Sequence, residues 1–435
     1  MSVGIGLPAE GKGRSLRGMF RTAIKNPLAT VAFVFPIAIV FDTKLVPVFL
    51  AAILIGAVWR DWPLRPRIWW PLAISILAFA VWALVSAIWS FDPAQSLERS
   101  FRFWLALCGG LLLCGVAAAR DFDNRATVRR ALAIGLLVAS LVSLAAGTVG
   151  DSVPWPAVGA YIRSMPLLSF GAIAALCVFL LLAGLDDGPK APLVYLAVAV
   201  AAGAIYSYGN SASGIALAAG VCVAAFVYWI GRPMVFALAV LLPLTFLVLP
   251  VAVQVANFPA FAKEMGWTID HSAGHRLIVW RYTYSKILER PAFGWGLHTS
   301  RIMPDKDAVH PADNPAYQDI FEITALSRNA KIGVMPMHPH NSTLQTMLEL
   351  GIVGAVLYAM VIGVVMIGLA RLALSRVAQA AGAGLATAIF VIGQLSFSAW
   401  QSWWLCYQFL AAASFLFIVR KYAAGDVRNG TNVSA

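Results

Sequence analysis

Apolar runs of about 16 to 24 residues recur along the whole chain, separated by short polar stretches. A helix of about 20 apolar residues crosses the roughly 30 Å hydrocarbon core of a bilayer. The pattern therefore predicts an all-α polytopic membrane protein. We expect twelve spans, near residues 28–43, 44–59, 69–90, 101–119, 129–149, 165–185, 191–207, 212–230, 233–255, 342–370, 377–399 and 402–419.

Composition supports this fold class. Of the 435 residues, 60% are hydrophobic and 12% are charged, whereas charged residues make up about 25% of ordinary soluble domains. An ordinary soluble globule is therefore excluded. A net charge of +12 would suggest nucleic acid as the partner of a soluble protein, but in a membrane protein Lys and Arg mark cytoplasmic loops. We expect membrane lipids around the chain and no nucleic acid.

The distribution of charge predicts the topology. If the N-terminus is cytoplasmic, the cytoplasmic segments carry 19 of the 32 Lys and Arg residues, as the positive-inside rule requires. The long segment 256–341 lies outside, in the periplasm, with nine basic and eight acidic residues. The expected organisation is a cytoplasmic basic arm, helices 1 to 9, a periplasmic loop, helices 10 to 12 and a cytoplasmic tail, at residues 1–27, 28–255, 256–341, 342–420 and 421–435.

The long loop should have structure of its own, since structureless loops of this length are uncommon. Ser272 can cap a helix over residues 273–289, which Pro291 and the Gly294-x-Gly296 pair would end. Its apolar stripe, formed by Leu277, Trp280, Tyr284 and Ile287 or Leu288, should lie along the membrane surface. A second short helix should begin at Asn314-Pro315 and reach about Leu326.

The stretch from Met337 to Gly354, MHPHNSTLQTMLELGIVG, combines two histidines with the start of a span. Pro339 favours an extended His338, so both histidines precede the helix. Ser342-x-x-Gln345 is a candidate capping box, which would place free N–H groups beside His340. A helix N-terminus suits a diphosphate and a neutral imidazole suits a general base, although a purely structural histidine is the alternative.

Several charged and small residues near the outer face are further candidates. Arg163 stands just before the sixth span, and Arg276 shares a helix face with Trp280. Arg99 and Arg102 begin the fourth span, where solvated arginines are the simpler interpretation. Within the tenth span, Glu349 is either a functional carboxyl or a structurally paired one. Gly351 and Gly354 would let another helix approach closely.

No metal site is expected. The six histidines lie in the long loop without H-x3-H or H-E-x-x-H spacing, and the acids are scattered. All five cysteines lie within apolar runs and are interpreted as buried hydrophobes. We therefore predict neither a metal nor any other cofactor.

At these residues the chain resembles the O-antigen ligase family, within the superfamily of O-antigen polymerases and O-linked oligosaccharyltransferases. One family motif, His, a small polar residue, nine residues and Gly-x-x-Gly, is met by His340, Asn341, Gly351 and Gly354. Another, Arg-x3-Trp followed by Pro-x-Phe-Gly-x-Gly, is met by Arg276, Trp280 and residues 291–296, which include Gly294 and Gly296. The chain departs from the family at Asn210-Ser211-Ala212-Ser213, where many members have Ser-Arg.

The resemblance implies a GT-C-type glycosyltransferase in a Gram-negative inner membrane, acting in lipopolysaccharide biosynthesis. It would transfer an O-antigen glycan from undecaprenyl diphosphate to a hydroxyl of lipid A–core at the periplasmic face. His340 would be the base, with His338 as the alternative or an orienting partner. The remaining substrate-binding candidates are Arg276, Arg163, Asn341 and Trp280.

Three alternatives remain. An O-antigen polymerase would use a second lipid-linked glycan as acceptor. An O-linked oligosaccharyltransferase is less favoured, because the C-terminal domain common in protein-directed transferases is not seen after the last span. A small-anion transporter would need paired broken helices in two related halves, and the sequence shows no such halves.

Overall fold

The computed structural model describes residues 27–60, 66–119, 124–149, 167–185, 192–207, 211–255, 257–308, 311–327 and 333–419, and these residues are predominantly helical. Within them, the isolated parallel bridge between Ile269 and Thr324 is the one β pairing. The predicted basic arm, the C-terminal tail and Arg163 lie outside the described residues, apart from the helix start at Pro27.

Each of the twelve expected spans coincides with one helix. The helices are α2 (Pro27–Phe41), α3 (Leu45–Arg60), α4 (Trp70–Val85), α5 (Pro93–Ala119), α6 (Arg125–Val149), α8 (Leu167–Ala183), α9 (Pro192–Ser207), α10 (Ser211–Ile230), α11 (Arg232–Val255), α15 (Ser342–Arg371), α16 (Arg376–Leu395) and α17 (Ser402–Ile418). A 3-10 turn, η1 (Ser86–Trp89), extends α4. Seven helices in the described chain are long and apolar enough to span a membrane, and five are shorter apolar helices. The protein is thus a multi-pass membrane protein, while the count of twelve crossings stays a prediction.

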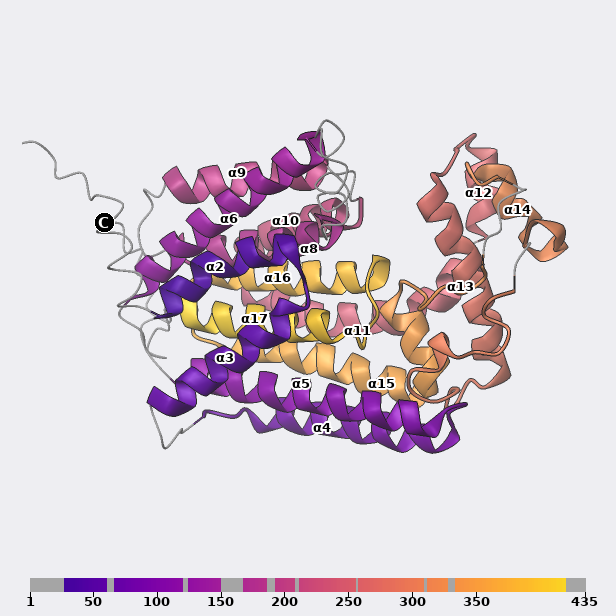
Figure 1. The fold of residues 1–435 in the computed structure, drawn as a ribbon, viewed down its shortest axis with the longest axis horizontal. Helices are drawn as coiled ribbons and strands as arrows, with labels where there is room; N and C mark the ends of the chain where they lie inside the picture. The colour runs from indigo at the N-terminus through magenta and orange to yellow at the C-terminus, as the bar shows by residue number, and fades with distance from the viewer. Residues whose placement is uncertain are drawn as a thin grey trace, which may run out of the picture.

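These helices lie side by side in a bundle (Figure 1), in which α10 packs along α16, α11 along α15 and α2 along α6. Large apolar side chains point outward from the bundle, such as Trp229 at 81% and Phe101 at 69% exposure. In water such a surface would associate, whereas in a membrane it contacts lipid tails.

The long loop folds into a lobe at one end of the bundle, seen at the right of Figure 1. It contains α12 (Phe258–Glu264), α13 (His271–Glu289) and α14 (Gln318–Ile323), with the 3-10 turns η3 (Thr299–Arg301), η4 (Pro311–Asp313) and η5 (Pro315–Tyr317). As predicted, Asn314 caps the second short helical segment: its side chain accepts from the Ala316 N–H at 2.9 Å. That segment ends at Ile323, before the predicted Leu326.

Two details of the predicted loop helix are wrong. The cap is Asp270, whose carboxylate accepts from the Ala273 N–H at 2.9 Å, and not Ser272. The fully buried apolar positions are Ile278, Val279, Tyr282 and Ile287, of which only the last was in the predicted stripe. This face packs into a second hydrophobic core shared with α11 and α15. Leu277 and Trp280 of the predicted stripe are partly buried against this core, whereas Leu288 is exposed, so α13 packs on protein through a face that only overlaps the predicted stripe.

Candidate active site

Helix α15 is broken at Gly351, which has φ +66° and ψ −169°. The backbone of loop 291–296 takes over the hydrogen bonds that the break removes. Trp295 and Gly296 N–H groups donate to the Leu348 and Glu349 carbonyls at 2.9 and 2.8 Å, and the Ile352 N–H donates to the Pro291 carbonyl at 2.9 Å. The Pro-x-Phe-Gly-x-Gly motif is thus the backbone partner of the interrupted helix.

Glycine is required on both sides of this contact. A Cβ at Gly351 would lie 2.2 Å from the Ala292 carbonyl oxygen, and one at Gly294 (φ +69°) would lie 2.6 Å from the Glu349 backbone. Gly296 has φ +99°. At Gly354 a Cβ would lie 2.2 Å from the Leu350 side chain of the same helix. The missing side chain of Gly351 therefore makes room for loop 291–296. Its spacing from Gly354 had predicted the close approach of another helix instead.

The histidine turn, residues 338–340, leads directly into α15. The Trp280 indole donates to the Pro339 carbonyl at 2.8 Å, which ties the turn to α13. His340 adopts the left-handed region, with φ +54°, a conformation that is uncommon for a residue with a side chain. Asn341 then caps α15 by accepting from the Leu344 N–H at 2.9 Å. The predicted capping box is wrong, because the Ser342 hydroxyl instead donates to the Gly393 carbonyl.

Hydrogen bonds define which imidazole nitrogens carry protons. His340 Nδ1 lies 2.7 Å from the Ser396 carbonyl oxygen, which can only accept, so this nitrogen carries the hydrogen. The Nε2 of neutral His340 therefore holds the basic lone pair. His338 is the reverse case: its Nδ1 accepts from the His340 N–H at 3.1 Å, so its hydrogen is on Nε2.

Both histidines are held neutral. Burial, together with the neighbouring His340 and Arg301, lowers the pKa of His338 to about 3. Burial also lowers the pKa of His340, and Arg276 and His275 add to this effect while the bond to Ser396 opposes it. His338 is buried and His340 is partly exposed. Of the two rings, His340 thus combines access with a free basic nitrogen.

The predicted Arg276 lies near this turn, close enough to act on His340 electrostatically. Burial lowers the pKa of Arg276 itself, against the opposing effect of Asp270. The neighbouring His275 lies 3.2 Å from the Gly333 carbonyl through Nε2. The structure therefore brings together His338, His340, Arg276 and Trp280, while Asn341 serves as a helix cap.

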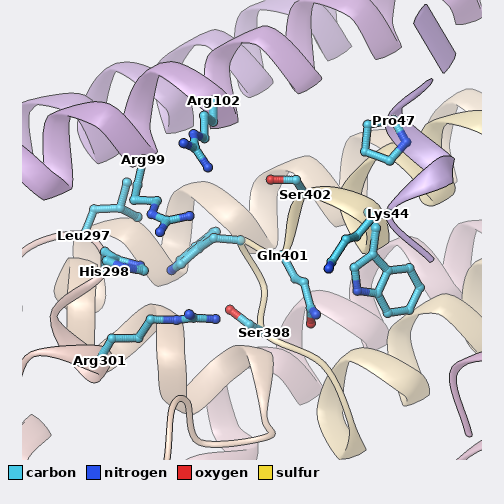
Figure 2. Close-up of a pocket in the computed structure, with 12 residues that line it drawn as sticks. Lys44, Pro47, Arg99, Arg102, Leu297, His298, Arg301, Ser398, Gln401 and Ser402 are labelled. Atoms are coloured by element: carbon cyan, nitrogen blue, oxygen red, sulfur yellow. The ribbon is translucent and has the colours of Figure 1, made fainter. Parts of the chain in front are cut away.

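A second group of cations lines a cavity of about 240 Å³ between the start of α5, turn η3 and the loop before α17. Figure 2 shows Arg99 and Arg102 reaching into it from α5, Arg301 from the opposite wall and Lys44 from the side. No acidic residue lines this cation pocket within the described chain. Burial, Arg301 and Arg99 lower the pKa of His298, also in the wall, to about 4.

Arg301 connects the cation pocket with the histidine turn. It lines the pocket, and it contributes to the lowered pKa of His338. Burial and the nearby Arg99 lower the pKa of Arg301, and Glu349 opposes this. Arg301 thus belongs to the cation pocket and acts electrostatically on the histidine turn.

The sequence did not reveal this pocket. Arg99 and Arg102 were interpreted as solvated, and Arg301, Lys44 and His298 were not singled out. The one sequence signal for this pocket is that its cations lie at the outer ends of different helices and turns. Within the described residues, no cluster of three or more His, Cys, Asp or Glu side chains could hold a metal ion.

Comparisons with known proteins indicate one family. Residues 157–359 match the model of a family described as O-antigen ligase, a range that includes Arg276, His340 and Gly351. A relative from Rickettsia conorii, provisionally named a polysaccharide ligase, is 26% identical over 363 residues, covering 80% of this chain and 78% of its own. A similarly named protein of Rickettsia felis is 25% identical over 79% of this chain and 80% of its own. Another, from Rickettsia bellii, is 24% identical over 77% of this chain and 78% of its own. The resemblance to the O-antigen ligase family is thus confirmed.

Proposed function

Starting from the O-antigen ligase family to which residues 157–359 belong, we propose that this protein transfers a glycan from undecaprenyl diphosphate to lipid A–core. The acceptor is a sugar hydroxyl, and the reaction takes place at the periplasmic face of a Gram-negative inner membrane. The observation that carries the proposal is the free Nε2 of His340, in a turn whose other histidine, His338, is within electrostatic reach of the pocket residue Arg301.

The reaction is a single displacement with inversion at the anomeric carbon. The acceptor oxygen forms a bond to this carbon as the bond from the carbon to the diphosphate oxygen breaks. His340 Nε2 takes the hydroxyl proton, and a positioned base of this kind contributes about 10²- to 10⁴-fold to the rate. His338 orients the turn through the His340 N–H.

The leaving diphosphate needs cations. Arg99, Arg102, Arg301 and Lys44 line the pocket, and guanidinium groups match phosphate oxygens in a fixed, bidentate geometry. Arg276 acts electrostatically on His340, and we assign it to the donor as a further cation. Arg163 stays a prediction, and so does a contribution from the α15 N-terminus. Because these cations can neutralise the leaving group, we expect transfer without a metal ion.

The test is transfer in vitro with purified protein, lipid-linked glycan and lipid A–core. We expect His340→Ala to lower kcat by about 10²- to 10⁴-fold, and Arg301→Ala and Arg276→Ala to weaken transfer as well. His271→Ala is the matched control, since His271 lies in the same loop and is exposed. Full activity of correctly folded His340→Ala protein would exclude His340 as the base.

Two further readouts test the substrate and metal assignments. Product on lipid A–core supports a ligase, whereas lengthened lipid-linked glycan would identify a polymerase. Activity that survives EDTA supports metal-independent transfer; loss that Mg²⁺ or Mn²⁺ restores would contradict it.

A further inference from the structure

Glu349 is a fully buried acid that the transfer reaction described above does not use. Its side chain is 0% exposed, and its two oxygens accept four hydrogen bonds. One oxygen accepts from the His298 N–H and from the Trp400 indole, the latter at 2.7 Å. The other accepts from the Ser300 hydroxyl at 2.6 Å and from the Gln345 amide at 3.1 Å. A fully buried carboxyl group needs hydrogen-bond partners, because burying a polar group without them is costly.

The donors fit a charged carboxylate. A backbone N–H and an indole N–H can only donate. The orientation of the Gln345 amide is fixed by its other contacts, because its oxygen accepts from the Ala399 N–H at 2.9 Å and its nitrogen donates to Ser398 at 3.0 Å. Three of the four partners must therefore donate, which solvates a negative charge in place of water.

The same four bonds reach the wall of the cation pocket. His298 and Trp400 line the pocket themselves, and Ser398 lines it while bonded to Gln345. The Ser300 hydroxyl also lies 3.5 Å from the Met337 carbonyl, next to His338. Through these hydrogen bonds Glu349 connects α15 with turn η3, with the loop before α17 and with Met337, the residue before the histidine turn.

Glu349 is also a buried acid behind a pocket whose charged lining side chains, Lys44, Arg99, Arg102 and Arg301, are all cations. Its electrostatic influence on Arg301 opposes that of Arg99. From these contacts we propose that Glu349 is a positioning residue, which holds the η3 and Trp400 wall so that the pocket cations bind the donor diphosphate next to His340. The assignment of the anion as the donor diphosphate rests on the proposed function. The positioning of the wall by Glu349 rests on the hydrogen bonds alone.

A positioning role and a purely electrostatic role predict opposite changes in anion binding when Glu349 is replaced by a neutral residue. If its charge merely tuned the pocket, removing a negative charge would tighten the binding of an anion. If Glu349 positions the wall, Glu349→Gln weakens anion binding, because an amide nitrogen replaces one accepting oxygen and faces at least one group that can only donate.

The first measurement is the binding of inorganic diphosphate to the full-length protein in detergent. For Glu349→Gln we expect a Kd raised about tenfold or more, since small displacements of binding groups have large effects. Glu322→Gln is the control: Glu322 lies in the lobe, on α14, pairs with Lys263 at 2.6 Å and is exposed. Unchanged or tighter binding by Glu349→Gln would overturn the proposal.

The second measurement separates positioning from a general loss of folded protein. We expect Glu349→Gln to raise the KM for the lipid-linked donor about tenfold, with the KM for the acceptor unchanged. A purely structural role would lower the active fraction and so kcat, with both KM values unchanged, and that result would contradict us.

Ser300→Ala serves if Glu349→Gln does not fold, because it removes one donor and leaves the charge. It should raise the Kd for diphosphate less than Glu349→Gln is expected to, by about threefold; the absence of any change would count against the proposal. The binding measurement needs no turnover. Protein that binds diphosphate in a Glu349-dependent manner but transfers no glycan would therefore disprove the proposed function while sustaining this inference.

Discussion

Helix α15 consists of two segments with different surroundings. Every residue of the first segment, from Ser342 to Leu350, is buried, and this segment holds Thr343, Gln345 and Glu349 among its polar side chains. The second segment, Ile352–Arg371, alternates buried small residues with lipid-facing ones such as Val356 at 49% exposure. One continuous apolar run therefore contains both an element of the site and an ordinary membrane helix.

The difference shows what a buried polar residue indicates in a membrane segment. In the first segment the side chains of Ser342, Thr343, Gln345 and Glu349 have partners from other parts of the chain, such as Gln394 for Thr343. The Thr346 hydroxyl donates to the Ser342 carbonyl within the helix. Unpartnered polar groups are costly in hydrocarbon, so these residues imply protein on every side. The second segment needs no such partners, because it exposes apolar side chains to lipid.

The largest effect is expected where the two segments meet. Gly351→Ala should destabilise the protein by about 3–6 kcal/mol, because the new Cβ would overlap the Ala292 carbonyl and the backbone conformation is essentially restricted to glycine. Thermal unfolding in detergent measures this. Gly214→Ala is the control, since a Cβ there meets nothing within 4 Å. Equal stability of the two variants would mean that the break is not needed.

The sequence predicted the parts of this architecture that depend on neighbouring residues. An apolar run is a local signal, so every expected span coincides with a helix. The His-Asn-x9-Gly-x-x-Gly spacing located the histidine turn in the same way. What it could not show was the break at Gly351, because the partner loop lies about 55 residues earlier and contributes backbone atoms.

The cation pocket illustrates the same limit. The sequence favours solvated Arg99 and Arg102, because their neighbours along the chain are ordinary helix residues. The cation that lines the pocket with them, Arg301, comes from a distant segment. The tautomer of His340 likewise depends on Ser396, which is 56 residues away. Function at this site depends on contacts between distant segments, which a single sequence does not report.

A smaller effect is expected from the polar pairs of the first segment. Thr343→Val should cost about 1–3 kcal/mol, because it leaves the Gln394 oxygen without the hydroxyl that donates to it at 2.8 Å. Val356→Thr makes the reverse change in the second segment and should cost less, since a threonine hydroxyl in a helix can bond to a carbonyl one turn earlier. Unfolding in detergent should rank the two variants; the opposite order would remove the distinction between the segments.

Acid should destabilise the protein through the turn that precedes the first segment. His338 has a pKa of about 3 in the folded protein against an ordinary value of about 6.5. Below pH 6.5 the unfolded chain therefore binds a proton that the folded protein does not, and stability falls with decreasing pH by about 1.4 kcal/mol per unit. Between pH 7 and pH 5 the loss should be about 2 kcal/mol.

The slope of unfolding free energy against pH measures this contribution. His338→Asn should reduce the slope, because asparagine can accept the His340 N–H without titrating, whereas His271→Asn, at an exposed position, should leave it unchanged. A slope that is the same in wild type and His338→Asn would show that another group is responsible.

The smallest effect tests how α13 holds the histidine turn against the first segment. Trp280→Phe keeps an aromatic ring but removes the N–H that donates to the Pro339 carbonyl at 2.8 Å, which should cost about 1 kcal/mol. Transfer should fall only a few-fold, because His340 keeps its own bond to Ser396. Trp229→Phe, at a position that is 81% exposed, is the control. If Trp280→Phe lost as much activity as His340→Ala, the indole would have to contact substrate as well as position the turn.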